Sequence, residues 1–201
     1  RLQFHMERSP LDLHAFRNRS DGRIEVFAGD GQQFRADGQY ANADRAVTCE
    51  GAWKARFEEA GGKLRGFPFS PAGFARAELL ELNAAEWERL LGRHDPVLGT
   101  HMPAGEPLGH AECGASHAWA LRFFPRHFPE FAFKVFTCSS WLLDPQFQRC
   151  LKPDSNIVRY QREFFLIPLA RATDSQHFER VFGGPVADLD RAPRETSVQR
   201  A

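Results

Sequence analysis

The chain has 201 residues, and its 26 basic and 26 acidic side chains give a formal net charge of zero at pH 7. A chain of this length can bury a core without disulfide or metal staples, and an apolar content of 42% excludes general disorder. Strong nucleic-acid binders carry a basic excess, so the charge balance predicts no nucleic-acid partner. No apolar run approaches the roughly 20 residues of a membrane span, and we expect no membrane partner either.

The cysteines are spread along the sequence at Cys49, Cys113, Cys138 and Cys150. None forms a CxxC pair, and the spacing matches no zinc template. A helix would bring His110, Cys113 and His117 toward one side, but chance explains this trio better than a metal cluster without a fourth ligand. Thiols in this pattern are typical of a reduced protein, so we expect a cytoplasmic location and no bound metal.

The two ends of the sequence suggest a piece of a longer protein. The first residue is Arg1 rather than Met, and residues 196–201 are typical of a helix cut off as it begins. No internal repeat, low-complexity tract or convincing linker interrupts the chain. We therefore expect residues 1–201 to form a single domain.

The first third is predicted to contain short strands near residues 2–5, 24–27 and 33–36, separated by glycine turns. This pattern indicates hairpins or a meander. Residues 38–50 are polar and alanine-rich, and we expect them to be irregular. A further strand is predicted over residues 77–82.

Two short helices are predicted in the same half. The first would hold Trp53 and Phe57 at helical spacing and end at Gly61 and the glycine after it. The second would begin after Asn83, with Glu86 three residues later as in a capping box. Its apolar positions are Trp87, Leu90 and Leu91.

The second half alternates more regularly between strand and helix. This alternation argues for an α/β fold, and the earlier hairpins argue against a purely parallel sheet. We therefore predict a mixed sheet with helices on both faces. In chain order the patterns indicate a strand over 96–102, a loop over 103–109, a helix over 111–124, a strand over 131–138, a helix from 144, a strand over 157–167 and a partly helical tail from 174.

The segment from His101 to Gly109 joins a predicted strand to a predicted helix. Such a connection offers free backbone N–H groups and the positive end of a helix dipole, which suit an anion such as a pyrophosphate. A plain connection explains the same residues, because neither the P-loop nor the GxGxxG pattern occurs. His101 is the best candidate for a general base, and a structural histidine that shapes the loop is the alternative.

A second candidate segment runs over residues 136–145. Cys138 could act as a nucleophile or general acid, although no basic residue stands beside it in the sequence and a buried thiol is the alternative. Ser139 or Ser140 could bind an oxyanion, and Trp141 could line an acyl pocket or the core. Asn156 opens the last predicted strand, where a substrate contact and an ordinary turn role are both open.

Several of these segments together resemble a bacterial family of acyltransferase-domain proteins, in which a helical N-terminal domain precedes a GNAT-like C-terminal domain. The Trp-Leu-Leu-Asp-Pro segment at 141–145 and the Ser-Asn-Ile segment at 155–157 are the most distinctive. One departure is that Gly109 and His110 stand where a Ser/Thr-Pro helix start is expected. The resemblance covers Leu82, Trp87 and Leu90, then residues 95–98, 101–105, 123–129, 138–145 and 154–157, and finally Leu189, Asp190, Pro193, Arg194, Thr196 and Ser197.

This resemblance implies a GNAT-like fold: a mixed, mostly antiparallel sheet with helices on both faces. Acyl-CoA would lie as co-substrate between two splayed strands, residues 97–102 and 131–138. The implied partners are a small-molecule acyl acceptor and a helical N-terminal domain of the same protein. The residues placed against the coenzyme are Met102, Ala104, Gly105 and Gly109.

The resemblance favours an acyl-CoA-dependent N-acyltransferase acting on an unidentified amine. His101, or a water that it holds, would deprotonate the amine, and Cys138 or a nearby hydroxyl would protonate the leaving thiolate. A non-catalytic GNAT-like module that binds a small molecule or a partner is the alternative, favoured by the absence of the usual Arg/Gln-x-x-Gly-x-Gly/Ala phosphate loop. A third reading is a covalent acyl-enzyme on Cys138.

Overall fold

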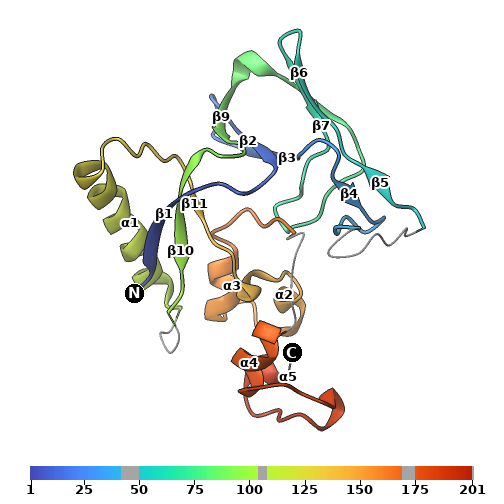
Figure 1. Cartoon of the computed structure of the whole chain (residues 1–201), viewed down its shortest axis with the longest axis vertical. Coiled ribbons are helices and arrows are strands. Elements are labelled where there is room, and N and C mark those ends of the chain that lie inside the picture. The colour runs from blue at the N-terminus through green and yellow to red at the C-terminus, as the bar shows by residue number, and fades with distance from the viewer. Residues whose placement is uncertain (42–49, 104–107, 169–174, 201) are drawn as a thin grey trace.

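The computed structural model describes residues 1–41, 50–103, 108–168 and 175–200. Its strands form four small sheets, mostly antiparallel, where the sequence predicted a single mixed sheet with helices on both faces (Figure 1). The mixed α/β class is therefore confirmed, and the single sheet is corrected. No helix in these ranges combines the length and apolar character needed to cross a bilayer.

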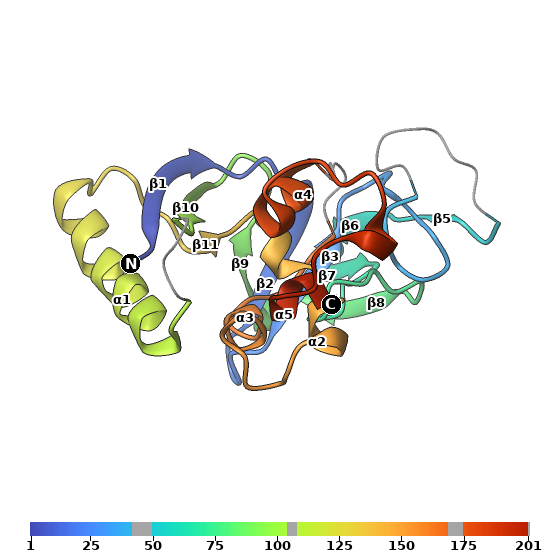
Figure 2. The same ribbon diagram turned by 90° about the horizontal axis from the view of Figure 1, so that it is seen from below.

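The sheet next to α1 (His110–His127) is built from β1 (Gln3–Arg8), β10 (Pro96–His101) and β11 (Phe136–Thr137). β10 lies in the middle, antiparallel to β1 and parallel to β11. The helix α1 follows β10 and stands beside this sheet in both views (Figures 1 and 2). These elements match the predicted strand over 96–102 and helix over 111–124.

The remaining strands form three further sheets away from α1 (Figure 1). One has the order β3-β2-β9, another the order β6-β7-β8, and β4 pairs with β5. The predicted strands near residues 24–27 and 33–36 are confirmed as β3 and β4. The bounds are β2 (Leu13–Asn18), β3 (Ile24–Ala28), β4 (Gln33–Phe34), β5 (Trp53–Lys54), β6 (Phe57–Ala60), β7 (Lys63–Gly66), β8 (Leu80–Asn83) and β9 (Trp87–Leu91).

Short helices follow β11 and end the chain. α3 lies next to α1 and next to η2 (Trp141–Leu143). After β11 the chain therefore packs back against α1. The predicted helical tail is confirmed as α4 and α5. The bounds are α2 (Phe147–Cys150), α3 (Asn156–Gln161), α4 (Ser175–Phe182), η3 (Leu189–Arg191) and α5 (Ser197–Arg200).

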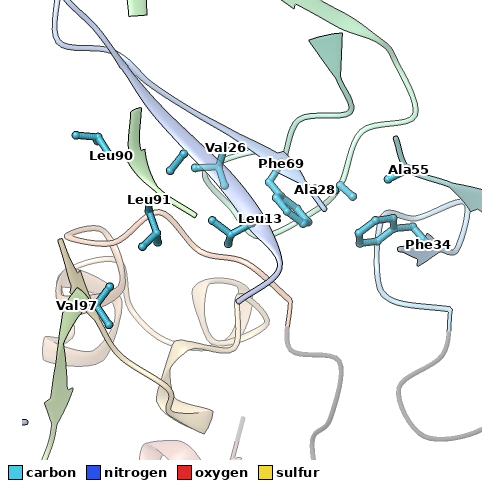
Figure 3. Close-up of a cluster of buried hydrophobic side chains, with 11 residues drawn as sticks. Leu13, Val26, Ala28, Phe34, Ala55, Phe69, Leu90, Leu91 and Val97 are labelled. Atoms are coloured by element: carbon cyan, nitrogen blue, oxygen red, sulfur yellow. The ribbon is translucent and has the colours of Figure 1, made fainter. Parts of the chain in front are cut away.

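The largest buried cluster joins the two halves of the molecule (Figure 3). Leu13 and Val26 come from the β3-β2-β9 sheet, Phe34 and Phe69 from the neighbouring strands and loops, and Val97 from β10. Phe34, Phe69 and Val97 are almost completely buried. Val97 shares this buried cluster with residues of the other sheets, so apolar burial links the β1-β10-β11 sheet to the rest of the chain.

The predicted helix around Trp53 and Phe57 is wrong. Trp53 lies in β5 and Phe57 begins β6, which forms a hairpin with β7. Gly61 and Gly62 both have positive φ and form the turn of that hairpin instead of ending a helix. Apolar residues four apart fit either structure, and the Gly-Gly turn favours the hairpin.

The helix predicted after Asn83 is also wrong, although Asn83 does cap a turn. Its side-chain oxygen accepts from the backbone N–H of Ala85, but the 3-10 turn η1 (Ala84–Glu86) ends at once and β9 follows. A bulge between β2 and β9 places Leu90 as an extra residue, so Leu90 and Leu91 are both buried. This break in strand alternation imitates helical spacing.

Of two predicted strands in the second half, one is much reduced and the other is wrong. The Phe-rich segment over 131–138 contributes only the two residues of β11. The segment over 157–167 begins as helix α3, because the Ser155 hydroxyl accepts a hydrogen bond from the Val158 N–H and caps it. Ile157 and Val158 have high strand propensity, and the cap overrides it.

Candidate functional site

β10 and β11 pair over a short distance and then stop pairing. Leu98 lies opposite Phe136, and Gly99 lies opposite Thr137. β10 continues to His101, whereas β11 ends at Thr137, so no ladder joins the two strands beyond the Gly99–Thr137 pair in the described ranges. Beyond the Gly99–Thr137 pair the backbone polar groups of the two strands are no longer paired with each other, and this end of the ladder is called the gap.

α1 begins at the same end of the sheet. Gly109 is its N-cap residue, and no side chain caps the free N–H groups of the first turn. A small surface hollow opens here, and Met102 contributes to it. The lining residues are Arg1, Leu2, Met102, Pro103, Leu108, Glu112 and Cys113.

Glu112 folds back over the start of α1. A Cβ placed on Gly109 would lie 2.0 Å from its Oε2 atom, so the carboxylate occupies space that any larger residue at position 109 would fill. A carboxylate interacts favourably with the helix dipole at this end. It would also oppose a second anion at the same place.

Two hydroxyls are buried beside the gap without a hydrogen-bond partner: Thr100 Oγ1 and the Tyr160 hydroxyl. Thr100 lies two residues beyond Leu98 in β10, so it shares the face of the sheet that Leu98 packs against Ala120 and Phe124 of α1. Leaving a buried hydroxyl unpaired costs about 1–3 kcal/mol. Both hydroxyls therefore have unused hydrogen-bonding capacity.

The Cys138 thiol lies next to the Tyr160 hydroxyl, although the pair does not reach hydrogen-bonding geometry. Burial raises the pKa of Cys138 to about 11, and the nearby Tyr160 hydroxyl lowers it by less. Burial, with smaller contributions from Cys138 and Cys113, raises the pKa of Tyr160. Both groups therefore stay protonated near neutral pH, which does not favour a thiolate nucleophile.

His117 packs on the α1 face of the sheet among aromatic rings. Its ring meets Phe4 at 5.6 Å and Phe136 at 4.8 Å between centroids, both edge to face. Burial lowers the pKa of His117, and a backbone hydrogen bond and Glu163 raise it by less. His117 is thus a half-buried ring that packs among aromatic side chains, and its burial disfavours the charged form.

The other members of the possible metal trio have separate surroundings. His110 Nδ1 lies 3.3 Å from Glu163 Oε1, which ties α1 to the turn after α3. Cys113 is a buried free thiol whose pKa is raised chiefly by burial. No cluster of three or more metal-binding side chains exists in the described part of the chain.

His101 ends β10 opposite Gln3 and is exposed. Alternation places it on the face opposite Thr100, away from α1. Tyr160 lies close to both Cys138 and Cys113 of α1, which places Cys138 on the α1 face of the sheet. The sheet therefore separates His101 from Cys138. A Cys–His catalytic pair is therefore not assembled, and His101 makes no hydrogen bond or ion pair to any described residue.

The remaining candidates from the sequence lie in different surroundings, and two of them are exposed. Ala104 and Gly105 lie outside the described residues. Ser139 is exposed, and Trp141 meets the Phe147 ring at 5.8 Å in η2. Asn156 is the exposed first residue of α3, where the sequence predicted a strand.

Sequence reasoning missed Thr100 and Tyr160. Tyr160 lay in a segment assigned to a strand, and the signal that could have corrected this was Ser155, a good N-cap followed by six residues without glycine or proline. Thr100 was missed because it lies within a strand whose other residues are mostly apolar. Only its polar character between Leu98 and the strand end could have marked it.

Comparison with known proteins gives a family match over the whole chain: residues 1–201 match the model described as the GNAT-like C-terminal domain. No curated protein matches significantly. A crystal structure of an acyltransferase in complex with decanoyl-CoA and teicoplanin is 29% identical over 72% of this chain and 40% of its own, with a TM-score of 0.47. An acyltransferase in complex with decanoyl-CoA is 26% identical over 71% and 39%, with a TM-score of 0.46.

The chain thus spans about two fifths of the length of these similar structures. The family assignment does not depend on them, because the family model covers every residue from 1 to 201. This protein belongs to the GNAT-like C-terminal domain family.

Proposed function

We propose that this chain is the donor-binding and catalytic part of an acyl-CoA-dependent N-acyltransferase that acts on an unidentified amine. The observation that carries the proposal is the gap where β10 and β11 stop pairing, at the start of α1, with Thr100 Oγ1 and the Tyr160 hydroxyl unpartnered beside it. A buried polar group without a partner is a place where a ligand adds hydrogen bonds at little cost. Membership of a GNAT-like family makes acyl-CoA the fitting ligand.

The thioester would lie between the two strands, with its carbonyl oxygen toward β10. Backbone N–H groups at the gap and the Thr100 hydroxyl would donate to that oxygen as negative charge develops there. Fixed donors aimed at a developing oxyanion are among the strongest contributions to acyl transfer. Direct attack by the amine forms the amide C–N bond and breaks the C–S bond.

The leaving thiolate needs a proton, and Tyr160 is the better donor for it. Its hydroxyl is buried and has no hydrogen-bond partner, so it can donate to the sulfur without giving up an existing hydrogen bond. Cys138, the donor expected from the sequence, has a pKa of about 11 and lies beside the Tyr160 hydroxyl. In this proposal Cys138 does not transfer a proton itself. The amine loses its proton on the other side of the thioester, where the histidines of the open sheet face, His101 among them, can accept it.

A non-catalytic binding module is the second candidate, favoured by the Glu112 carboxylate over Gly109. A pyrophosphate at the start of α1 would meet that negative charge. In this reading the gap binds another small molecule or a partner domain. The usual GNAT phosphate loop is absent from the sequence, which points the same way.

Thermal unfolding with coenzyme A and with acetyl-, octanoyl- and decanoyl-CoA separates the two. A ligand at one hundred times its dissociation constant stabilises the folded state by about 2.7 kcal/mol. A shift that depends on the acyl chain supports the transferase. No shift with millimolar ligand, in this chain and in the full-length protein, supports the binding module instead.

The sequence supplies a matched pair of variants for the acid, because the chain has only two tyrosines. Tyr160→Phe should bind acyl-CoA and lose most of the turnover. Tyr40→Phe removes the hydroxyl that accepts from Gln32 Nε2 at 2.9 Å and should leave turnover intact. Equal turnover in the two variants would remove Tyr160 from the mechanism.

A further inference from the structure

We propose that His5, held by Glu7, is the general base that deprotonates the acyl acceptor, with Thr137 holding Glu7 in turn; this rests on the transferase function proposed above. The three side chains lie on the face of the β1-β10-β11 sheet that is opposite α1. Phe4 packs on His117 and Phe124 of α1, so the odd-numbered residues of β1 point to the other face.

The register brings the three strands together in one row. His5 of β1 lies opposite Gly99 of β10, and Gly99 lies opposite Thr137 of β11. This row contains the last pair between β10 and β11, immediately before the gap. The side chains of His5 and Thr137 therefore stand where the proposed thioester begins.

Gly99 makes this cluster possible because it has no side chain. A Cβ at Gly99 would lie 2.2 Å from His5 Nε2 and 2.7 Å from Glu7 Oε1. The imidazole and the carboxylate thus lie directly over the backbone of β10. Any other residue at position 99 would push both groups away.

Glu7 uses both carboxylate oxygens to hold the cluster. Oε2 lies 3.1 Å from His5 Nε2, and Oε1 accepts a hydrogen bond of 3.0 Å from Thr137 Oγ1. A carboxylate only accepts, so His5 donates from Nε2 and its Nδ1 carries the lone pair. The His5 side chain is 57% exposed, and Nδ1 is the ring nitrogen that Glu7 does not engage.

The arrangement gives His5 two properties of a general base. Glu7 fixes the tautomer and stabilises the imidazolium that forms, as a carboxylate does behind a catalytic histidine. His101 lies on the same face one row further along β10 and has no such partner among the described residues. His5 is therefore the better base of the two.

The proton balance follows from the two faces. As the amine nitrogen bonds to the thioester carbon, its proton passes to His5 Nδ1. The C–S bond breaks, and the thiolate takes the proton of Tyr160 from the α1 face. His5 then releases its proton to solvent, and solvent returns one to Tyr160.

The test uses the full-length protein with octanoyl-CoA, and it measures release of free coenzyme A with ethanolamine, benzylamine or water as acceptor. His5→Gln should lower kcat by about 100-fold or more, the usual range for loss of a general base, with an unchanged thermal shift on octanoyl-CoA. His127→Gln, at an exposed histidine in the last turn of α1, is the matched control and should stay within a few-fold of the unmodified protein. Glu7→Gln should lower kcat by about tenfold and alter the acid limb of the pH–rate profile, because Glu7 acts only through His5.

The outcomes separate the base from the transferase itself. Retained turnover in His5→Gln overturns the assignment, and loss in His101→Gln instead would transfer the role to His101. Octanoyl-CoA that binds without any release of coenzyme A overturns the base and leaves the donor site standing. No thermal shift with octanoyl-CoA overturns the proposed function, and the base with it.

Discussion

The two faces of the β1-β10-β11 sheet are built from alternate residues of the same strands, yet they differ sharply. The α1 face is aromatic and closed: Phe4, Phe136 and His117 pack together, and the hydroxyls of Thr100 and Tyr160 are buried beside them. The open face carries His5 and its polar partners in contact with solvent. Strand alternation thus places buried hydroxyls on one face and an exposed histidine on the other.

The largest expected effect comes from breaking the closed face. Leu98 is fully buried against Ala120 and Phe124, so Leu98→Ala should cost about 2–5 kcal/mol in free energy of unfolding. Denaturant titration measures it. Thr137→Ala on the open face is the control and should cost no more than about 1.5 kcal/mol, the range for one hydrogen bond. Equal costs would contradict the contrast between the faces.

The next prediction sharpens the contrast between structure and chemistry on the closed face. Thr100→Val removes a buried hydroxyl without a partner and keeps the shape, so the free energy of unfolding should stay equal or rise. The same change should weaken turnover, because Thr100 is proposed to donate to the thioester oxygen. Loss of more than about 1 kcal/mol would mean that the hydroxyl is satisfied in the folded protein.

A pH titration of stability tests the half-buried His117 ring on the closed face. The pKa of His117 in the folded protein is lowered chiefly by burial, so the unfolded chain binds the proton first as pH falls. The contribution of the neutral His117 ring to the free energy of unfolding is fully present above about pH 6.5, the pKa of histidine in the unfolded chain. It is lost as pH falls toward the pKa of His117 in the folded protein.

The melting temperature should therefore fall from pH 7 to pH 5, and His117→Phe should flatten part of that fall. His14 keeps the rest, because burial, assisted by Arg89, also lowers its pKa. An unchanged slope in His117→Phe would show that His117 titrates like an exposed residue.

The smallest effect concerns the start of α1. Glu112→Gln removes the negative charge that lies over Gly109 and should tighten binding of coenzyme A by about 0.3–1 kcal/mol, the range for one charge at a helix end. Calorimetry at two salt concentrations would show the gain shrinking as salt screens it. Weaker binding would mean that Glu112 holds the coenzyme through a hydrogen bond.

The sequence predicted the elements that frame the site better than the side chains that fill it. The strand that ends at His101 and the helix after Gly109 follow from their apolar patterns and from the loop between them. Tyr160 was missed because Ile157 and Val158 suggested a strand, and the Ser155 cap decides for a helix. The row of His5, Gly99 and Thr137 depends on strand register, which single-sequence patterns do not specify.

The most direct test of the account is a crystal structure of the full-length protein with octanoyl-CoA. We predict that the thioester lies between β10 and β11, with its carbonyl oxygen within hydrogen-bonding distance of Thr100 and its sulfur beside Tyr160. The His5 ring should face the carbonyl carbon from the open side. An acyl-CoA bound away from this gap, with Thr100 and Tyr160 still unpartnered, would contradict the central claim.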